Sequence, residues 1–112
     1  MRRLLAGFMV TLLLLAGACS PTTASGPVTI NVTIANGNVS PSGATYDVTK
    51  GAEVTINVTS DSADTVHVHG YEIEKDVVAG QQTVITFVAD QTGRYEIETH
   101  TIEATIATLN VR

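Results

Sequence analysis

The sequence predicts an all-β fold, a sandwich or barrel of seven or eight short antiparallel strands. Apolar and polar residues alternate over several segments after residue 28, which is the pattern of strands with one buried face. Turn-forming clusters of Gly, Asn, Asp and Ser separate these segments at intervals of about ten residues. No segment after residue 28 has useful helical periodicity. The 85 residues from Val28 to Arg112 are enough for one modest core.

The alternation places the strands in order along the chain. The first covers residues 28–34 and is followed by a turn at 36–38 and an irregular stretch at 39–43. Later strands are predicted over 45–48, 53–59, 65–71, 72–78, 82–88, 95–99 and 104–111. Residues 82–88 carry apolar side chains at both even and odd positions, so we expect a central strand that is covered on both faces.

Histidines are the most distinctive side chains of the predicted sandwich. His67 and His69 are two residues apart in a predicted strand, so their imidazoles share one face. His100 follows about thirty residues later, near the end of another strand. Val66 and Val68 form the opposite face of the histidine strand. The pattern leaves open which of the two faces points inward.

Two imidazoles on one strand face, with a third that the fold can bring near them, suit a borderline divalent ion such as Cu(II), Zn(II) or Ni(II). Carboxylates that would complete such a site are Glu72, Glu96, Glu98 and Glu103. The only cysteine is at position 19 and both methionines lie within the first nine residues, so the predicted domain has no sulfur ligand and Cu(I) is disfavoured. The alternative is that the histidines are half-buried strand residues that bond to backbone or carboxylate groups.

The N-terminus has the features of an export signal. Two arginines precede an apolar run over residues 4–18 that is shorter than the roughly 20 residues of a membrane-spanning helix. The run ends in Leu15-Ala16-Gly17-Ala18-Cys19, which resembles the lipobox of bacterial lipoproteins. This resemblance implies a signal peptide over 1–18 and acylation of Cys19. The small, polar and proline-rich residues that follow predict a flexible linker over 19–27, so the folded domain covers 28–112. A plain secretory signal cut near the same place is the alternative.

The charge of the mature chain excludes some classes of partner. Loss of the signal removes Arg2 and Arg3 and leaves four Lys and Arg (six less two) against eleven Asp and Glu, a formal charge of −7. Binding to nucleic acid, or to anionic lipid by charge, requires clustered basic residues. We therefore expect no nucleic-acid partner, and membrane attachment only through the lipid at Cys19.

Three stretches follow one another in the predicted domain, Gly51-Ala52-Glu53-Val54, Val66 to Gly70 and Gly93 to Thr99. In this order they resemble the small exported cupredoxin-like domains of bacterial iron- and copper-handling lipoproteins, and the resemblance covers the chain from about Val28 onward. It implies a Greek-key sandwich or barrel. It also implies that His69, followed by Gly70-Tyr71, matches the family's first copper ligand. The family's cysteine position falls on Thr99, and residues 101–107 offer no later histidine or methionine, so a blue-copper electron-transfer site is excluded.

Enzymatic alternatives are weaker. The His-Val-His sequence is similar to a strand of the copper-zinc superoxide dismutases, but that family needs more than three histidines and a disulfide. No Gly-x-Ser-x-Gly elbow or activated nucleophile supports a hydrolase. We therefore expect a non-enzymatic lipoprotein on the outer face of a bacterial membrane, with a candidate Cu(II) or other divalent metal site at His67, His69 and His100. The competing hypothesis is a metal-free module that docks a protein of the cell envelope.

Overall fold

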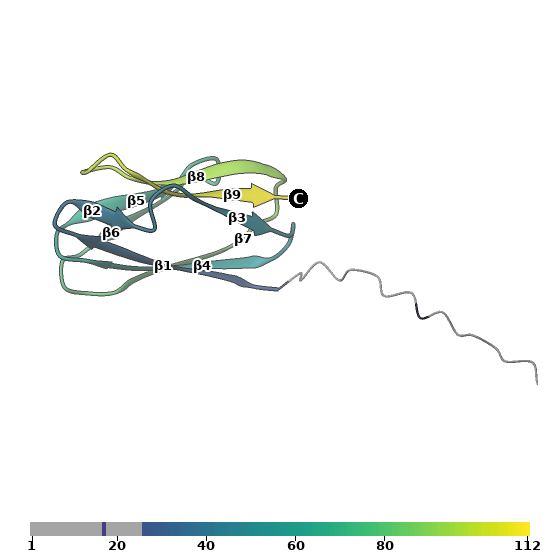
Figure 1. Cartoon of the computed structure of the whole chain (residues 1–112), viewed down its shortest axis with the longest axis horizontal. Helices are drawn as coiled ribbons and strands as arrows, with labels where there is room; N and C mark the ends of the chain where they lie inside the picture. Colours follow the sequence, from purple (N-terminus) through teal and green to yellow (C-terminus); the bar gives the residue numbers. More distant parts are fainter. Residues whose placement is uncertain (1–16, 18–25) are drawn as a thin grey trace, which may run out of the picture.

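The computed structural model describes Gly17 and residues 26–112, and these residues form a β-sandwich (Figure 1). The rest of the predicted signal peptide, Cys19 and most of the predicted linker lie outside the described residues. The strands of the described part are β1 (Val28–Ala35), β2 (Asn38–Ser40), β3 (Ala44–Val48), β4 (Glu53–Ser60), β5 (Asp64–Val68), β6 (Ile73–Val77), β7 (Thr83–Val88), β8 (Gly93–Thr99) and β9 (Thr105–Val111). The described residues include no helix that is long and apolar enough to cross a bilayer.

Two sheets face each other across one apolar core. One sheet has the order β2-β1-β4-β7 and the other has the order β3-β9-β8-β5-β6. The inward residues of the alternating strands are almost fully buried and β-branched for the most part, as a pleated core surface favours. Ile30 and Ile56 of the first sheet and Ile97 and Leu109 of the second are each 0% exposed. The predicted all-β sandwich is therefore confirmed.

Both sheets are mixed, whereas the sequence pattern predicts wholly antiparallel strands. β1 pairs with β4, and β3 pairs with β9, in parallel. The connection from β1 to β4 passes through β3 in the opposite sheet and returns in the original direction, and such a crossover produces a parallel pair. The β1–β4 pairing places two copies of the hexapeptide Val-Thr-Ile-Asn-Val-Thr, at 28–33 and 54–59, side by side in register.

β7 is an edge strand, so the expectation of a central strand covered on both faces is wrong. It pairs only with β4 within its sheet. Ile85 faces the core and is 3% exposed, but Val84 and Val88 on the other face are 45% and 52% exposed. The apolar residues at even positions of this segment are thus valines on the outer surface of an edge strand, and those at odd positions face the core.

The burial of β5 decides which face of the histidine strand points outward. Val66 and Val68 are each 0% exposed and belong to the core. His67 therefore projects from the outer face of the five-stranded sheet, between β6 on one side and β8 on the other. The strand itself ends at Val68, and His69 begins the turn that leads into β6.

Candidate metal centre

His67 lies at the middle of the outer face of β5 and has a carboxylate on each side. Strand register pairs it with Glu74 of β6 and with Glu98 of β8. Direct cross-strand neighbours in antiparallel pairs have their Cβ atoms about 4.5–5.5 Å apart, so both carboxylates are within reach of the ring. Only 13% of the His67 side chain is exposed. The register thus surrounds one largely buried imidazole with acidic groups.

A tight turn at residues 69–72 brings His69 beside His67. Gly70 has a φ of 92°, a conformation that is open to glycine and strained for other residues. A Cβ atom at Gly70 would also overlap the ring of Tyr95. The His69 N–H donates to the Glu96 carbonyl at 2.8 Å, which ties the turn to β8. With this backbone, the ring centroids of His67 and His69 are 5.2 Å apart.

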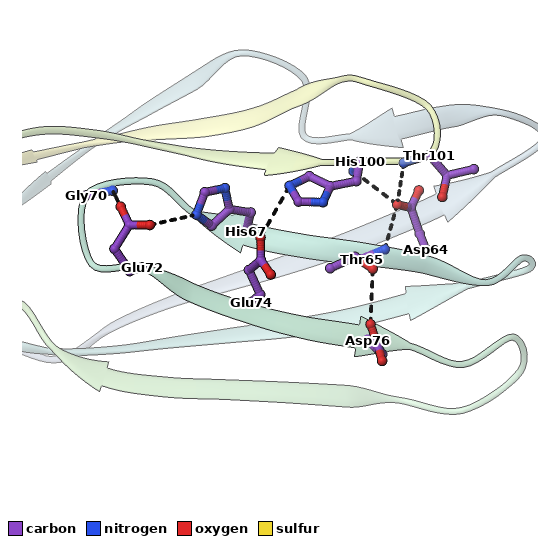
Figure 2. A network of polar contacts seen from close by, with 9 residues as sticks. All are labelled: Asp64, Thr65, His67, Gly70, Glu72, Glu74, Asp76, His100 and Thr101. Carbon is purple, nitrogen blue, oxygen red and sulfur yellow. Dashed lines mark hydrogen bonds and ion pairs between the residues drawn. The ribbon is translucent and has the colours of Figure 1, made fainter.

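His100 reaches the same face from the end of β8, and Asp64 holds its backbone. Asp64 is 6% exposed, and its Oδ1 accepts hydrogen bonds from the N–H groups of Thr65 (2.7 Å), His100 (3.2 Å) and Thr101 (2.9 Å). Figure 2 shows the His100 ring extending from this anchor toward Glu74, and its Nε2 lies 3.9 Å from Glu74 Oε1. The ring centroids of His100 and His67 are 5.4 Å apart.

The Nε2 atom of His67 is buried and has no hydrogen-bond partner among the described residues. The nearest carboxylate oxygen is Glu72 Oε2, which lies 3.8 Å away, too far for a hydrogen bond (Figure 2). Glu72 itself is fixed by the turn, because its Oε1 accepts from the Gly70 N–H at 3.3 Å. Buried polar atoms in proteins are normally satisfied, and an unsatisfied one is costly. This nitrogen is therefore well suited to bind a group that the protein chain does not supply.

The three histidines do not converge on one point. Ligand atoms within 4.8 Å of one another form two sets, one of His67, Glu74 and His100 and the other of His67, His69 and Glu98. No set found among the described residues contains all three histidines. His67 belongs to both sets. Of the four carboxylates predicted from sequence, only Glu98 belongs to one of these sets. Glu74 was missed, because only the β5–β6 register shows that it lies opposite His67.

The residues present do not fit a blue-copper centre. Thr99 is 2% exposed and lies opposite Val66, on the core side of β8. Its hydroxyl accepts from the Ala104 N–H at 3.0 Å, so its role is to close the loop before β9. His69 lies just beyond the end of β5, level with Glu96. The position matched to the family's cysteine and the histidine matched to its first ligand are thus separated in the sheet, and neither cysteine nor methionine occurs in residues 26–112.

Comparison with known families agrees with this architecture. Residues 8–107 match the family model described as a cupredoxin-like domain. This chain belongs to the cupredoxin-like domain family. No curated protein sequence matches it significantly.

Solved structures with the same fold include copper-binding proteins. An NMR structure of a copper binding protein in its apo form has a TM-score of 0.60 and 15% identity, over 75% of this cupredoxin-like chain and 86% of that one. Fet3p, a multicopper oxidase that functions in iron import, has a TM-score of 0.61 and 16% identity, over 75% of this chain. A chain of a heme-copper terminal oxidase dimer has a TM-score of 0.58 and 15% identity, over 76% of this chain.

The two oxidase chains are longer than this cupredoxin-like domain. The domain spans 23% of the Fet3p chain and 65% of the terminal oxidase chain. At 15–16% identity, the likeness to all three structures establishes the fold alone. The chain thus combines a fold found in copper-binding proteins with His and Glu groups on an outer sheet face that have metal-ligand spacing.

Proposed function

We propose that this protein is a non-enzymatic, membrane-tethered extracytoplasmic domain that binds a borderline divalent ion on the outer face of its five-stranded sheet. The observation that carries the proposal is the environment of His67. Its buried Nε2 lacks a hydrogen-bond partner, and two further imidazoles and two carboxylates lie around it. Nitrogen and oxygen donors of this kind favour Cu(II), followed by Zn(II) and Ni(II).

Electrostatics on this face favour a cation. Glu72 and Glu74 lie on the β6 side of His67, and Glu98 lies on the β8 side. Negative charges that converge on one surface raise the local concentration of counter-ions. Without a thiolate ligand, bound Cu(II) would have a tetragonal nitrogen and oxygen field and would lack the intense charge-transfer band of a blue-copper protein.

The proposal is tested by titrating the full chain, without a histidine tag and with Cys19→Ser to remove its one thiol, with Cu(II), Zn(II) and Ni(II). We expect saturable Cu(II) binding and nitrogen hyperfine coupling in the electron paramagnetic resonance spectrum. The variant with His67, His69 and His100 all changed to Ala should lose both. Equal and weak uptake by the parent and this triple variant would refute the metal site.

Glu53 supplies a control for the carboxylates. It is an exposed glutamate on β4, in the opposite sheet. Glu53→Gln changes the net charge by the same amount as Glu74→Gln or Glu98→Gln. We expect Cu(II) affinity to fall in Glu74→Gln and Glu98→Gln and to stay constant in Glu53→Gln. If all three substitutions weaken binding equally, the carboxylates act only through net charge.

Membrane tethering follows from the N-terminal sequence. The lipobox-like end of the apolar run supports acylation of Cys19, and acyl chains on that residue would hold the domain at the outer face of a bacterial membrane. A metal-binding domain held there would meet ions as they enter or leave the cell envelope. Its protein partner, if it hands the ion on, would also be a protein of the envelope.

The exposed edge of the four-stranded sheet supports a second candidate function, the docking of an envelope protein. Val78 lies just after β6, and Val84 and Val88 are on β7; these three are the exposed large apolar residues of the described part, each 45–52% exposed. An edge strand also offers unpaired backbone groups for strand addition. The metal titration separates the two functions, because a docking module would not depend on the histidines. It would instead lose its partner on Val84→Lys.

A further inference from the structure

The metal-ligand groups on the five-stranded sheet form two overlapping sets rather than one site. His67, Glu74 and His100 make up the first set, and His67, His69 and Glu98 make up the second. Each set offers two imidazoles and one carboxylate within the same 4.8 Å limit. The two sets therefore offer the same kinds of ligand atom.

The sets extend toward opposite ends of β5. His69 lies in the turn after the strand, whereas the backbone of His100 is held at the start of the strand by Asp64 and Thr65. Their rings approach His67 at similar centroid distances, 5.2 Å and 5.4 Å. Both sets border an open pocket of about 400 Å³, because His100 of the first set and Glu98 of the second both line it, together with Thr99, Glu103, Ala104 and Thr105.

On the basis of the proposed function, we infer that this face binds one divalent ion at a time, in two alternative positions that share His67. A neutral imidazole has one acceptor nitrogen, while the other nitrogen carries a proton, so His67 can serve only one ion unless it loses that proton. Two divalent ions held on one ring would also repel each other strongly, because the repulsion scales with the product of their charges. Occupation of one position thus excludes the other.

Alternating occupancy allows a bound ion to move along the strand. An ion bound near the 69–72 turn can move to the His100 position by exchanging His69 and Glu98 for His100 and Glu74 while it stays beside His67. Each position has one ligand residue in the lining of the open pocket, His100 in the first and Glu98 in the second, so an incoming ligand atom of a recipient has access beside either. The class of ligand is a borderline divalent cation in both positions.

Two double variants test the inference, each made in the full chain with Cys19→Ser and without a tag. Glu74→Gln/His100→Ala removes the first set, and His69→Ala/Glu98→Gln removes the second. Stoichiometry and Kd are measured for Cu(II) and Zn(II) by competitive titration against a chelator. The parent and both double variants should each bind one ion. Losing one of two equal positions raises Kd by about twofold through mass action, and we expect the rise to stay below about tenfold.

Substitution of His67 affects both positions. His67→Ala and the more conservative His67→Gln should each raise Kd by at least about a hundredfold, a loss that even outer-shell partners of a metal can cause. The Cu(II) resonance spectrum of the parent should be the sum of two signals, with one signal retained in each double variant. Circular dichroism confirms that every variant keeps its β-sheet content.

The results distinguish the failure of the inference from the failure of the proposed function. Two Cu(II) ions per parent chain would overturn the inference, as would loss of binding in one double variant and no change in the other. Both of these results leave the metal-binding function intact. Unchanged weak uptake in the His67 variants and in both double variants would overturn the inference and the proposed function together.

Discussion

Asp64 and His100 are 36 residues apart in the chain, and the His100 N–H donates to Asp64 Oδ1 at 3.2 Å. The same oxygen accepts from the Thr101 N–H at 2.9 Å, so a single carboxylate at the start of β5 holds the loop that follows β8. Hydrogen bonds to an ionised acceptor are stronger than those between neutral groups. The placement of the His100 imidazole therefore depends on a residue that is itself outside both ligand sets.

We predict that Asp64→Ala loosens this loop. Buried donors that lose their acceptor cost about 1–3 kcal/mol, so the free energy of unfolding should fall by about that amount. Hydrogen exchange should speed up more at Thr101 than at His100, because the His100 N–H also donates to the Thr65 carbonyl at 3.0 Å. Asp76→Ala is the control, since that exposed carboxylate accepts only from the Thr65 hydroxyl among the hydrogen bonds described. Equal exchange rates in the two variants would contradict the role of Asp64.

A second prediction concerns the turn that presents His69. Gly70→Ala introduces a Cβ both at a positive φ and against the Tyr95 ring, whereas Gly80→Ala introduces one at a φ of 77° with open space around it. Left-handed backbone costs a non-glycine residue about 1–2 kcal/mol, and Gly80→Ala should lose about that much stability. Gly70→Ala should lose at least about 1 kcal/mol more, because it also overpacks the ring. Urea denaturation measures both values, and indistinguishable midpoints would show that the ring moves aside freely.

Cys19 provides a third prediction. Cys19→Ser should move the protein from the detergent-extracted membrane fraction to the soluble extracytoplasmic fraction, or stall its maturation, because the acyl acceptor is gone. Ser20→Ala, next to it, is the control and should fractionate like the parent. Fractionation and immunoblotting of cells that express each variant provide the measurement. A Cys19→Ser protein that matures and stays on the membrane like the parent would rule out the lipoprotein assignment.

A fourth prediction concerns pH. The hydrogen bond from Arg112, with further contributions from Asn110 and the Arg112 charge, lowers the pKa of Asp47 below its ordinary value of 3.8. The pKa of Asp47 is lower in the folded than in the unfolded protein, so its ion pair with Arg112 stabilises the fold above pH 3.8. This stabilisation is lost as the pH falls through the folded-state pKa. Arg112→Gln should therefore lower the thermal midpoint slightly at pH 7 and less at pH 2.5, the effect being small for an exposed pair. Arg94→Gln is the control for the loss of one positive charge. An Arg112→Gln variant whose thermal midpoint falls equally at both pH values would contradict the link to Asp47 ionisation.

Local sequence was sufficient to predict several strands of the sandwich. The alternation over 28–34 and 53–59 corresponds to β1 and β4, and Ala107, Leu109 and Val111 face the core of β9 in step. Such patterns are local, because successive side chains of a strand point to opposite faces whatever the strand pairs with. The absence of cysteine from residues 28–112 also excluded a blue-copper centre in the predicted domain, since such a centre requires a thiolate.

Tertiary structure decided the neighbours of each histidine. Alternation showed that Val66 and His67 point to opposite faces, but only packing of the two sheets made the valine face the buried one. The pairing of β5 with β6 and β8 then placed Glu74 and Glu98 beside His67, and the Asp64 anchor directed His100 to the same face. These relationships depend on the register between strands that are distant in the chain. The periodicity of a single strand carries no information about that register, because its partners are chosen by the burial of the whole core.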